Sequence, residues 1–150
     1  MKAIGLLEEG LNGSRLISIA VKDIQAYVRL ANLIKTNQSR LEEAHELCQR
    51  ALSRSPDNFR ATRETGHILL YMGKAQEAKT YLERAVELNP SEPNAHYLLS
   101  VAYTELDDLS QAESSLRRAL VLVGSAEISY MIHLCFVLQQ RGKLKEAEKL

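Results

Sequence analysis

The chain has 150 residues, of which 45% are hydrophobic and 25% are charged, a composition typical of one folded domain rather than of a disordered chain. Nineteen basic and nineteen acidic residues cancel, so no overall charge favours nucleic acid or an anionic membrane surface as a partner. The longest strongly apolar runs, such as residues 16–21, are far shorter than the roughly 20 residues that span a bilayer, which predicts no membrane segment.

The first 24 residues carry no recurring pattern. Residues 3–11 are typical of a short helix that ends at the turn signal formed by Asn12 and Gly13. Residues 15–21 are apolar enough for a helix or a strand, and we favour a helix. We expect residues 1–24 to pack as a helical lid on the segment that follows.

From residue 25 onward the sequence repeats with a period of 34 residues. Three columns share this period: Ala44, Ala78 and Ala112; Cys48, Leu82 and Leu116; and Ala51, Ala85 and Ala119. Pro56 and Pro90 are separated by the same interval. The amphipathic pattern of a single helix recurs every 3.6 residues and fixes no long period, so the columns indicate a repeated structural unit.

Each repeat contains two helical patterns separated by a short turn, which is Gly73 in the second repeat. Ser39 with Glu42, and Ser110 with Glu113, have the spacing of capping boxes and predict the starts of second helices. The alanine columns predict that paired helices approach closely, because short interaxial distances tolerate only small side chains. One such pair buries little apolar surface, so we expect the pairs to stack around a continuous core.

Four units account for the periodic part of the chain. Their predicted boundaries are 25–58, 59–92, 93–127 and 128–150. The third unit has one extra residue, because residues 142–147 match residues 73–78 at an offset of 69. The fourth unit stops inside its second helix and leaves the apolar face of Leu138, Leu144 and Ala147 without a partner. This predicts either a fragment of a longer protein or self-association through an uncapped C-terminal end.

The period, the alanine columns and the string NAHYLLSVAY at residues 94–103 resemble the tetratricopeptide repeat. The resemblance covers residues 25–150 and implies an all-α, right-handed superhelical solenoid of antiparallel helix pairs. Two features depart from the family pattern. Gly124 stands where proline is expected, and the first unit has Val28, Ala31, Asn32 and Lys35 where the family prefers a large aromatic residue, Leu, Gly and Tyr.

In the family, the first helices of the units line a concave groove that holds peptides. The resemblance implies that the partner-binding groove contains Arg29, Arg60, Arg63, His67, Asn94, Tyr97, Val101, Glu105, Phe136 and Gln139. The same columns contain Leu33, Leu70, Thr104, Ile132 and Gln140.

Charge is distributed unevenly along the repeats. Residues 25–63 contain seven basic and four acidic side chains, whereas residues 64–127 contain five and ten. Arginine binds carboxylates and phosphates through paired hydrogen bonds, so the three groove arginines favour a ligand with an acidic end. The aromatic and aliphatic residues further along favour an apolar end. The alternative is that these arginines are ordinary solvated surface.

No phosphate-binding loop, dinucleotide fingerprint, zinc-protease motif or nucleophile elbow occurs in the sequence. Cys48 and Cys135 fall in repeat columns and are predicted to be buried packing residues rather than metal ligands. We therefore predict a non-catalytic scaffold without metal or cofactor, which binds a protein or peptide but neither nucleic acid nor membrane. The alternative is the recruiting segment of a larger enzyme, such as a transferase, whose catalytic domain lies beyond residue 150.

The same two cysteines, and a pair of glutamates where a secretory signal would be apolar, favour a reducing, cytoplasmic compartment. Glycosylation sequons begin at Asn12 and Asn37, which is close to what chance gives for this composition. They would have a role only if the chain entered the secretory pathway.

Overall fold

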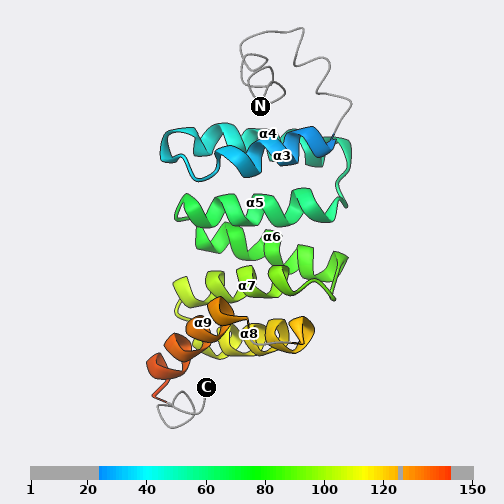
Figure 1. Cartoon of the computed structure of the whole chain (residues 1–150). Coiled ribbons are helices and arrows are strands. Elements are labelled where there is room, and N and C mark those ends of the chain that lie inside the picture. Colours follow the sequence, from blue (N-terminus) through cyan, green and yellow to red (C-terminus); the bar gives the residue numbers. More distant parts are fainter. Residues whose placement is uncertain (1–23, 125–126, 143–150) are drawn as a thin grey trace, which may run out of the picture.

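The fold is a stack of helices that follow one another in chain order (Figure 1). The structure is a computed structural model, and it describes residues 24–124 and 127–142. Within these ranges the α-helices are α3 (Ile24–Ile34), α4 (Leu41–Arg54), α5 (Phe59–Tyr71), α6 (Ala75–Leu88), α7 (Pro93–Glu105), α8 (Leu109–Val123) and α9 (Ile128–Gln140). A short 3₁₀ helix, η1 (Gln38–Arg40), precedes α4, and no strand is present in the described ranges.

Consecutive helices pack as pairs, α3 with α4, α5 with α6 and α7 with α8, and each pair also packs on the next. The core therefore extends along the whole stack as a series of apolar clusters. These observations confirm the predicted all-α solenoid of helix pairs. The predicted lid lies outside the described residues except for Ile24, and so do Leu144, Ala147 and the second helix of the fourth unit.

Small side chains occupy the contact between paired helices, as the columns predict. Every alanine of the two alanine columns has 0% of its surface exposed. Gly66 of α5 marks the tightest contact, because a Cβ atom added there would lie 2.5 Å from Cγ of Leu82 in α6. Leu82 is itself fully buried. The approach of α5 to α6 thus requires glycine at this position.

The turns that follow α5, α7 and α9 each use one residue with a left-handed backbone. Gly73, Asp107 and Gly142 have φ values of 75°, 61° and 75°. They occupy equivalent positions, 34 and 35 residues apart. Only glycine adopts this conformation without steric cost, so Asp107 is the strained member of the column.

Both predicted capping boxes are wrong. Asn37 accepts a hydrogen bond from the backbone N–H of Ser39 and caps η1, while α4 begins without a side-chain cap. Asp108 accepts from the backbone N–H of Gln111 and caps α8, so Ser110 lies inside that helix. In each case an amide or carboxylate side chain lies two residues before the serine and reaches the first N–H groups of the helix.

Glu113, the other member of the second predicted box, has a different role. Its carboxylate binds Arg117 at 3.0 Å and also binds Arg141. It therefore connects α8 to the end of α9 and does not reach back to the start of its own helix.

The two cysteines differ in burial. Cys48 is fully buried in α4, and burial raises the pKa of its thiol to about 12. Cys135 is only partly buried, so the prediction that it is a buried packing residue is wrong. Gly66, its equivalent in α5, is covered by Leu82 of α6.

A candidate binding groove on the first helices

The helices α3, α5, α7 and α9 present equivalent positions on one side of the stack, which we call the first-helix face. Arg29, Arg63 and Tyr97 are 34 residues apart in successive helices, as are Leu33, His67 and Val101. Because equivalent residues of stacked repeats occupy equivalent places, each set forms a row across the stack.

The three predicted arginines lie at the N-terminal end of this face. Arg29 and Arg60 are exposed, and the guanidinium of Arg63 lies over the Phe59 ring, 5.5 Å from its centroid. None of the three forms an ion pair with a residue that the structure describes. Their positive charge is thus not neutralised within the described fold.

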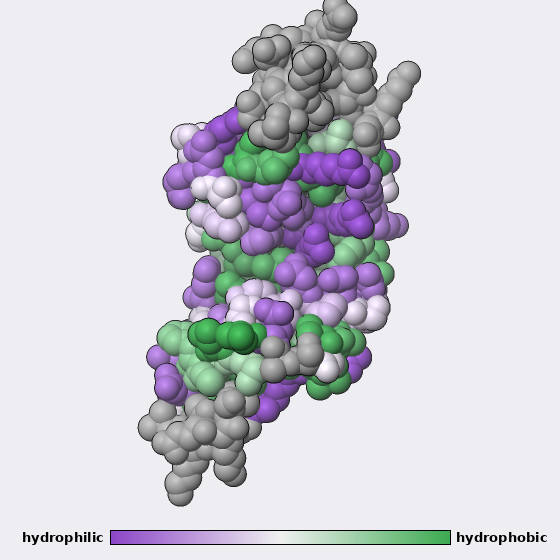
Figure 2. Space-filling model, in the orientation of Figure 1, coloured by the Kyte–Doolittle hydropathy of each residue, from purple (hydrophilic) through white to green (hydrophobic). Residues whose placement is uncertain are grey.

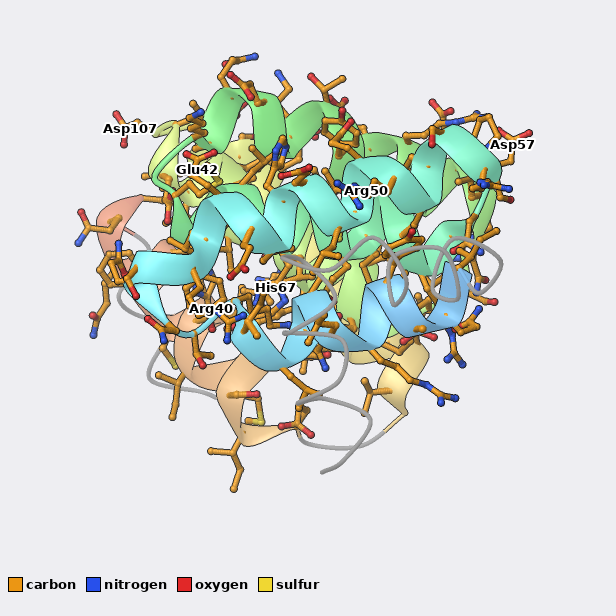
Figure 3. All side chains as sticks on the ribbon, turned by 90° about the horizontal axis from the view of Figure 1, so that it is seen from above. Arg40, Glu42, Arg50, Asp57, His67 and Asp107 are labelled. Carbon is orange, nitrogen blue, oxygen red and sulfur yellow. The ribbon has the colours of Figure 1, made fainter. Side chains whose placement is uncertain are left out.

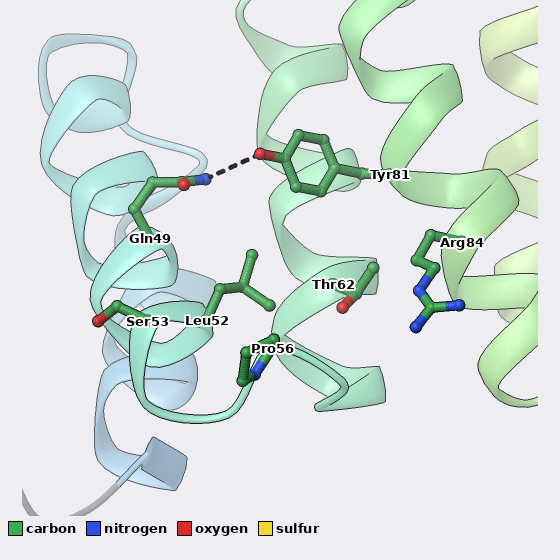
Figure 4. Close-up of a pocket in the computed structure, with 7 residues that line it drawn as sticks. All are labelled: Gln49, Leu52, Ser53, Pro56, Thr62, Tyr81 and Arg84. Atoms are coloured by element: carbon green, nitrogen blue, oxygen red, sulfur yellow. Dashed lines mark hydrogen bonds between the residues drawn. The ribbon is translucent and has the colours of Figure 1, made fainter.

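On the other side of the stack a second depression contains an arginine that is already paired (Figure 4). It lies among α4, α5 and α6, and Gln49 donates a 3.4 Å hydrogen bond to the Tyr81 hydroxyl across it. Arg84 binds Asp57 at 2.6 Å and Glu87 at 3.3 Å. This contrast makes the first-helix face the better candidate for an anionic ligand.

A buried polar network lies between α3 and α5 behind the first-helix face. Lys35 is 8% exposed and Glu64 3%, and their Nζ and Oε1 atoms are 2.7 Å apart. The Lys35 ammonium also donates to the Asn32 side chain and lies 3.0 Å from Nδ1 of His67. Sequence reasoning missed this network, although Lys35 stands in a column that elsewhere contains Leu69 and Tyr103.

His67 connects this network to the first-helix face. Burial is the largest cause of the fall in its pKa to about 4, followed by the charges of Lys35 and Arg63. The imidazole is therefore neutral at pH 7. Its ring stacks on Tyr71, with centroids 5.2 Å apart. Figure 3, which looks down the stack, shows His67 toward the middle of the molecule and Asp57 and Asp107 at its periphery.

A pocket of about 260 Å³ lies between α5 and α7 beside His67. Its lining residues are His67, Leu70, Tyr71, Tyr97, Leu98, Val101 and Glu105. The structure thus brings four of the predicted site residues together in one pocket, namely His67, Tyr97, Val101 and Glu105. Tyr71 and Leu98 are added to the site by the structure.

The pocket continues into an aromatic cluster between α7 and α9. Tyr97 stacks on Tyr130 with ring centroids 4.5 Å apart, and its ring meets His133 edge-on at 5.7 Å. Nε2 of His133 lies 3.0 Å from the Thr104 hydroxyl, and burial lowers the pKa of this histidine. Phe136 lies 6.4 Å from His133, between ring centroids.

Exposed apolar side chains lie beside this cluster. Ile132 and Phe136 have 65% and 46% of their surfaces exposed. On the face drawn in Figure 2, hydrophobic surface gathers at the end that contains α9, and hydrophilic surface covers much of the middle of the stack. Apolar surface of this kind is typical of sites that contact another protein.

The two remaining predicted residues, Asn94 and Gln139, also lie outside the pocket. Asn94 is partly buried and its side chain interacts with the Tyr130 hydroxyl. Gln139 is exposed near the end of α9. The part of the chain that the structure describes contains no group of three or more His, Cys, Asp or Glu side chains able to hold a metal ion. No helix in that part is long and apolar enough to span a bilayer.

These features define a helical-repeat solenoid whose first-helix face is mixed basic and aromatic in character. The profile of the tetratricopeptide repeat matches residues 63–127. The chain belongs to the tetratricopeptide repeat family.

Relatives of known sequence include a much longer protein. The chain is 33% identical over 147 residues to the human (Homo sapiens) protein O-mannosyl-transferase TMTC3, an alignment that covers 97% of this chain and 16% of that protein. The mouse (Mus musculus) protein of the same name is 37% identical over 109 residues and is covered to 12%. The chain thus spans only a small part of either relative, 16% of the human protein and 12% of the mouse protein.

Solved structures share the fold. MamA from Desulfovibrio magneticus RS-1, residues 41 to the end, has a TM-score of 0.76 at 22% identity, covering 99% of this chain and 90% of the other. The O-GlcNAc transferase of Thermobaculum terrenum has a TM-score of 0.71 at 27% identity and covers 77% of this chain, which spans 22% of that protein. The first likeness shows the fold alone.

Proposed function

We propose that the protein is a non-catalytic interaction scaffold that binds a peptide or protein segment along its first-helix face. The observation that supports this most is the arrangement of that face, where three arginines that form no ion pair with any described residue adjoin an aromatic pocket. A repeat solenoid offers such a continuous surface to extended ligands. Its mixed basic and aromatic character matches the composition of binding hot spots, which are enriched in arginine and tyrosine.

The ligand lies across the stack with an acidic end at Arg29, Arg60 and Arg63. Guanidinium groups bind carboxylates and phosphates through two parallel hydrogen bonds, so this end selects acidic side chains. The opposite end of the ligand is apolar and contacts Ile132 and Phe136, which would otherwise remain exposed. This orientation follows from the uneven distribution of arginines and apolar side chains along the face.

Peptide selection with a randomised displayed library tests this proposal. The expected binders carry Asp or Glu on one side of an apolar stretch, and their affinity is measured by fluorescence anisotropy. The double variant Arg60→Glu/Arg63→Glu should weaken binding about tenfold or more, because each charged hydrogen-bonded contact contributes about 1.5–3 kcal/mol. The matched control is Arg54→Glu/Arg118→Glu, which makes the same charge change at two exposed arginines of second helices. If both doubles weaken binding equally, the groove is not the site.

A second candidate function is recruitment of substrates or partners to a larger enzyme. It is favoured by the alignment with protein O-mannosyl-transferase TMTC3 over nearly the whole chain, which spans only a small part of that protein. In this case the first-helix face would bind a substrate protein for a catalytic domain elsewhere in the same polypeptide. Sequencing the full transcript tests the idea, and a stop codon directly after residue 150 would contradict it.

The proposal also includes the unit boundaries 25–58, 59–92, 93–127 and 128–150, a cytoplasmic location, and self-association of the chain. Two cysteines outside any disulfide support a reducing compartment. A cytoplasmic chain carries no glycan at Asn12 or Asn37, so a glycosidase-sensitive mass would contradict this location. Self-association through the C-terminal end predicts a mass in light scattering that rises with concentration.

A further inference from the structure

The pocket between α5 and α7 contains one polar atom whose state can be deduced from its neighbours. The Lys35 ammonium has three hydrogens and no lone pair, and its partners are Asn32, Glu64 and Nδ1 of His67. Because an ammonium only donates, Nδ1 of His67 must be the acceptor and carries no proton. The neutral imidazole therefore carries its hydrogen on Nε2.

This Nε2–H group is available to a ligand. No described residue accepts a hydrogen bond from it, and the histidine lines the pocket. No buried side-chain nitrogen or oxygen in the described part of the chain lacks a partner, so Nε2 is reached by solvent. The low pKa of His67, about 4, keeps this donor uncharged at neutral pH.

Glu105 supplies the opposite chemistry at the same pocket. Its side chain is exposed, and it forms no ion pair with any residue that the structure describes. It also lines a neighbouring depression together with Lys74 and Glu77, where the two carboxylates outnumber the single ammonium. The rim of the pocket is therefore negative, in contrast to the arginine end of the face.

The walls between these two polar groups are apolar. Leu70, Leu98 and Val101 form one part of the lining, and the rings of Tyr71 and Tyr97 form another. A volume of about 260 Å³ is sufficient for one side chain but not for a folded element. The pocket thus combines a neutral donor, an apolar wall and an anionic rim.

We propose that this pocket is the specificity subsite of the groove and takes an aliphatic or aromatic ligand residue that adjoins a lysine or arginine. His67 Nε2–H donates to a main-chain carbonyl oxygen of that ligand, and the Glu105 carboxylate pairs with the basic side chain. The inference rests on the proposed function and adds to it that the acidic end of the ligand is followed by an apolar and basic pair. An acidic residue at the same place would be repelled by Glu105.

Charge exchange at the rim tests the subsite. We would select peptides from the same randomised displayed library against the wild-type chain and against Glu105→Lys, with Glu42→Lys, at an exposed residue of α4, as a control of equal charge change. The expected result is a Lys or Arg preference next to an apolar residue for the wild type and for Glu42→Lys, replaced by an Asp or Glu preference for Glu105→Lys. A synthetic peptide with the wild-type consensus should lose about fivefold or more in affinity for Glu105→Lys. Its Lys→Glu counterpart should recover that loss.

The histidine is tested separately by nitrogen-15 NMR of the intact chain, with the resonances of His67 assigned by comparison with His67→Gln. The expected spectrum shows a proton on Nε2 and none on Nδ1 at neutral pH, and a shift of Nε2–H on addition of the consensus peptide. A proton on Nδ1, or an Nε2–H unaffected by bound peptide, would overturn the role of His67.

The results separate this inference from the proposed function. If peptide binding depends on Arg60 and Arg63 but Glu105→Lys selects the same consensus as the wild type, the subsite inference is wrong and the proposed function still stands. Failure to select any peptide would overturn both.

Discussion

Lys35 and Glu64 form a buried ion pair at the interface of the first two helix pairs, at positions that are apolar at the next interface. Thirty-four residues later the equivalent residues are Leu69 and Leu98, which belong to one apolar cluster. Burying two charges costs desolvation free energy, which their mutual attraction offsets only when both partners are present. The contribution of the ion pair to the free energy of unfolding can be measured by replacing both residues with leucine, the residue found at the equivalent positions of the next interface.

We expect Lys35→Leu to lower the free energy of unfolding by about 3–5 kcal/mol, because Glu64 would remain buried without its partner. The double variant Lys35→Leu/Glu64→Leu should match the wild type or exceed its stability by about 1–4 kcal/mol. Urea denaturation followed by circular dichroism measures both. A double variant as unstable as the single one would show that the pair stabilises the interface by more than its desolvation costs.

Stability should fall at acid pH through His67. Its pKa is about 4 in the folded chain and lies below the ordinary value of 6.5, so the unfolded chain binds a proton first as the pH falls. The stabilisation is complete above pH 6.5 and is lost progressively toward pH 4, at up to about 1.4 kcal/mol per pH unit. Burial also lowers the pKa of His133, which contributes with the same sign.

The measurement is the unfolding free energy between pH 7 and pH 4 for the wild type, His67→Gln, His133→Gln and the double variant. His67→Gln should flatten the profile more than His133→Gln does. Equal slopes for the wild type and His67→Gln would mean that this imidazole is not held neutral.

Gly66→Ala should destabilise the protein because the new methyl group meets Leu82. Overpacking of this kind costs about 1–3 kcal/mol, and the better helix propensity of alanine offsets about 1 kcal/mol of it. Leu82→Ala alone should lose about 2–5 kcal/mol by leaving a cavity. The double variant should lose less than the sum, since each change relieves the other, and strictly additive losses in thermal denaturation would contradict the close approach.

Substitutions of two adjacent aspartates at the turn between α7 and α8 should change the stability of the protein in opposite directions. Asp107→Gly relieves a left-handed backbone at φ 61° and should raise stability by up to about 1 kcal/mol, after allowance for the freer unfolded chain. Asp108→Ala removes the side chain that caps α8 and should lower stability by about 0.5–2 kcal/mol. Chemical denaturation of the two variants at one pH provides the comparison, and a loss with Asp107→Gly would contradict the assigned strain.

The sequence predicted the repeated features of the fold and missed the exceptions. Columns such as Ala78 and Ala112 recur because each must fit the same contact, so one period is enough to infer helix pairs and stacking. The Lys35–Glu64 pair does not recur, and each residue alone has the composition of ordinary surface. It could have been predicted by pairing Lys35 with the acidic residue that replaces Leu98 one unit earlier.

The candidate site was predicted in the same partial way. His67, Tyr97, Val101 and Glu105 line one pocket because equivalent positions of stacked units form rows, and their role in binding stays a prediction. That His67 carries its hydrogen on Nε2 depends on an ammonium from another helix pair, which spacing alone does not give. The helix starts were wrong for a local reason, since Asn37 and Asp108 compete with the serines that follow them.

The extra residue of the third unit has a geometric consequence. α8 has 15 residues where α6 has 14, and it ends at Gly124 with a left-handed backbone, where the earlier units have extended ends and a following proline. One added helical residue turns the exit of the chain by about 100°. Figure 1 shows α9 running obliquely to α7. A peptide bound along α3, α5 and α7 would therefore meet α9 at a different angle from the helices before it.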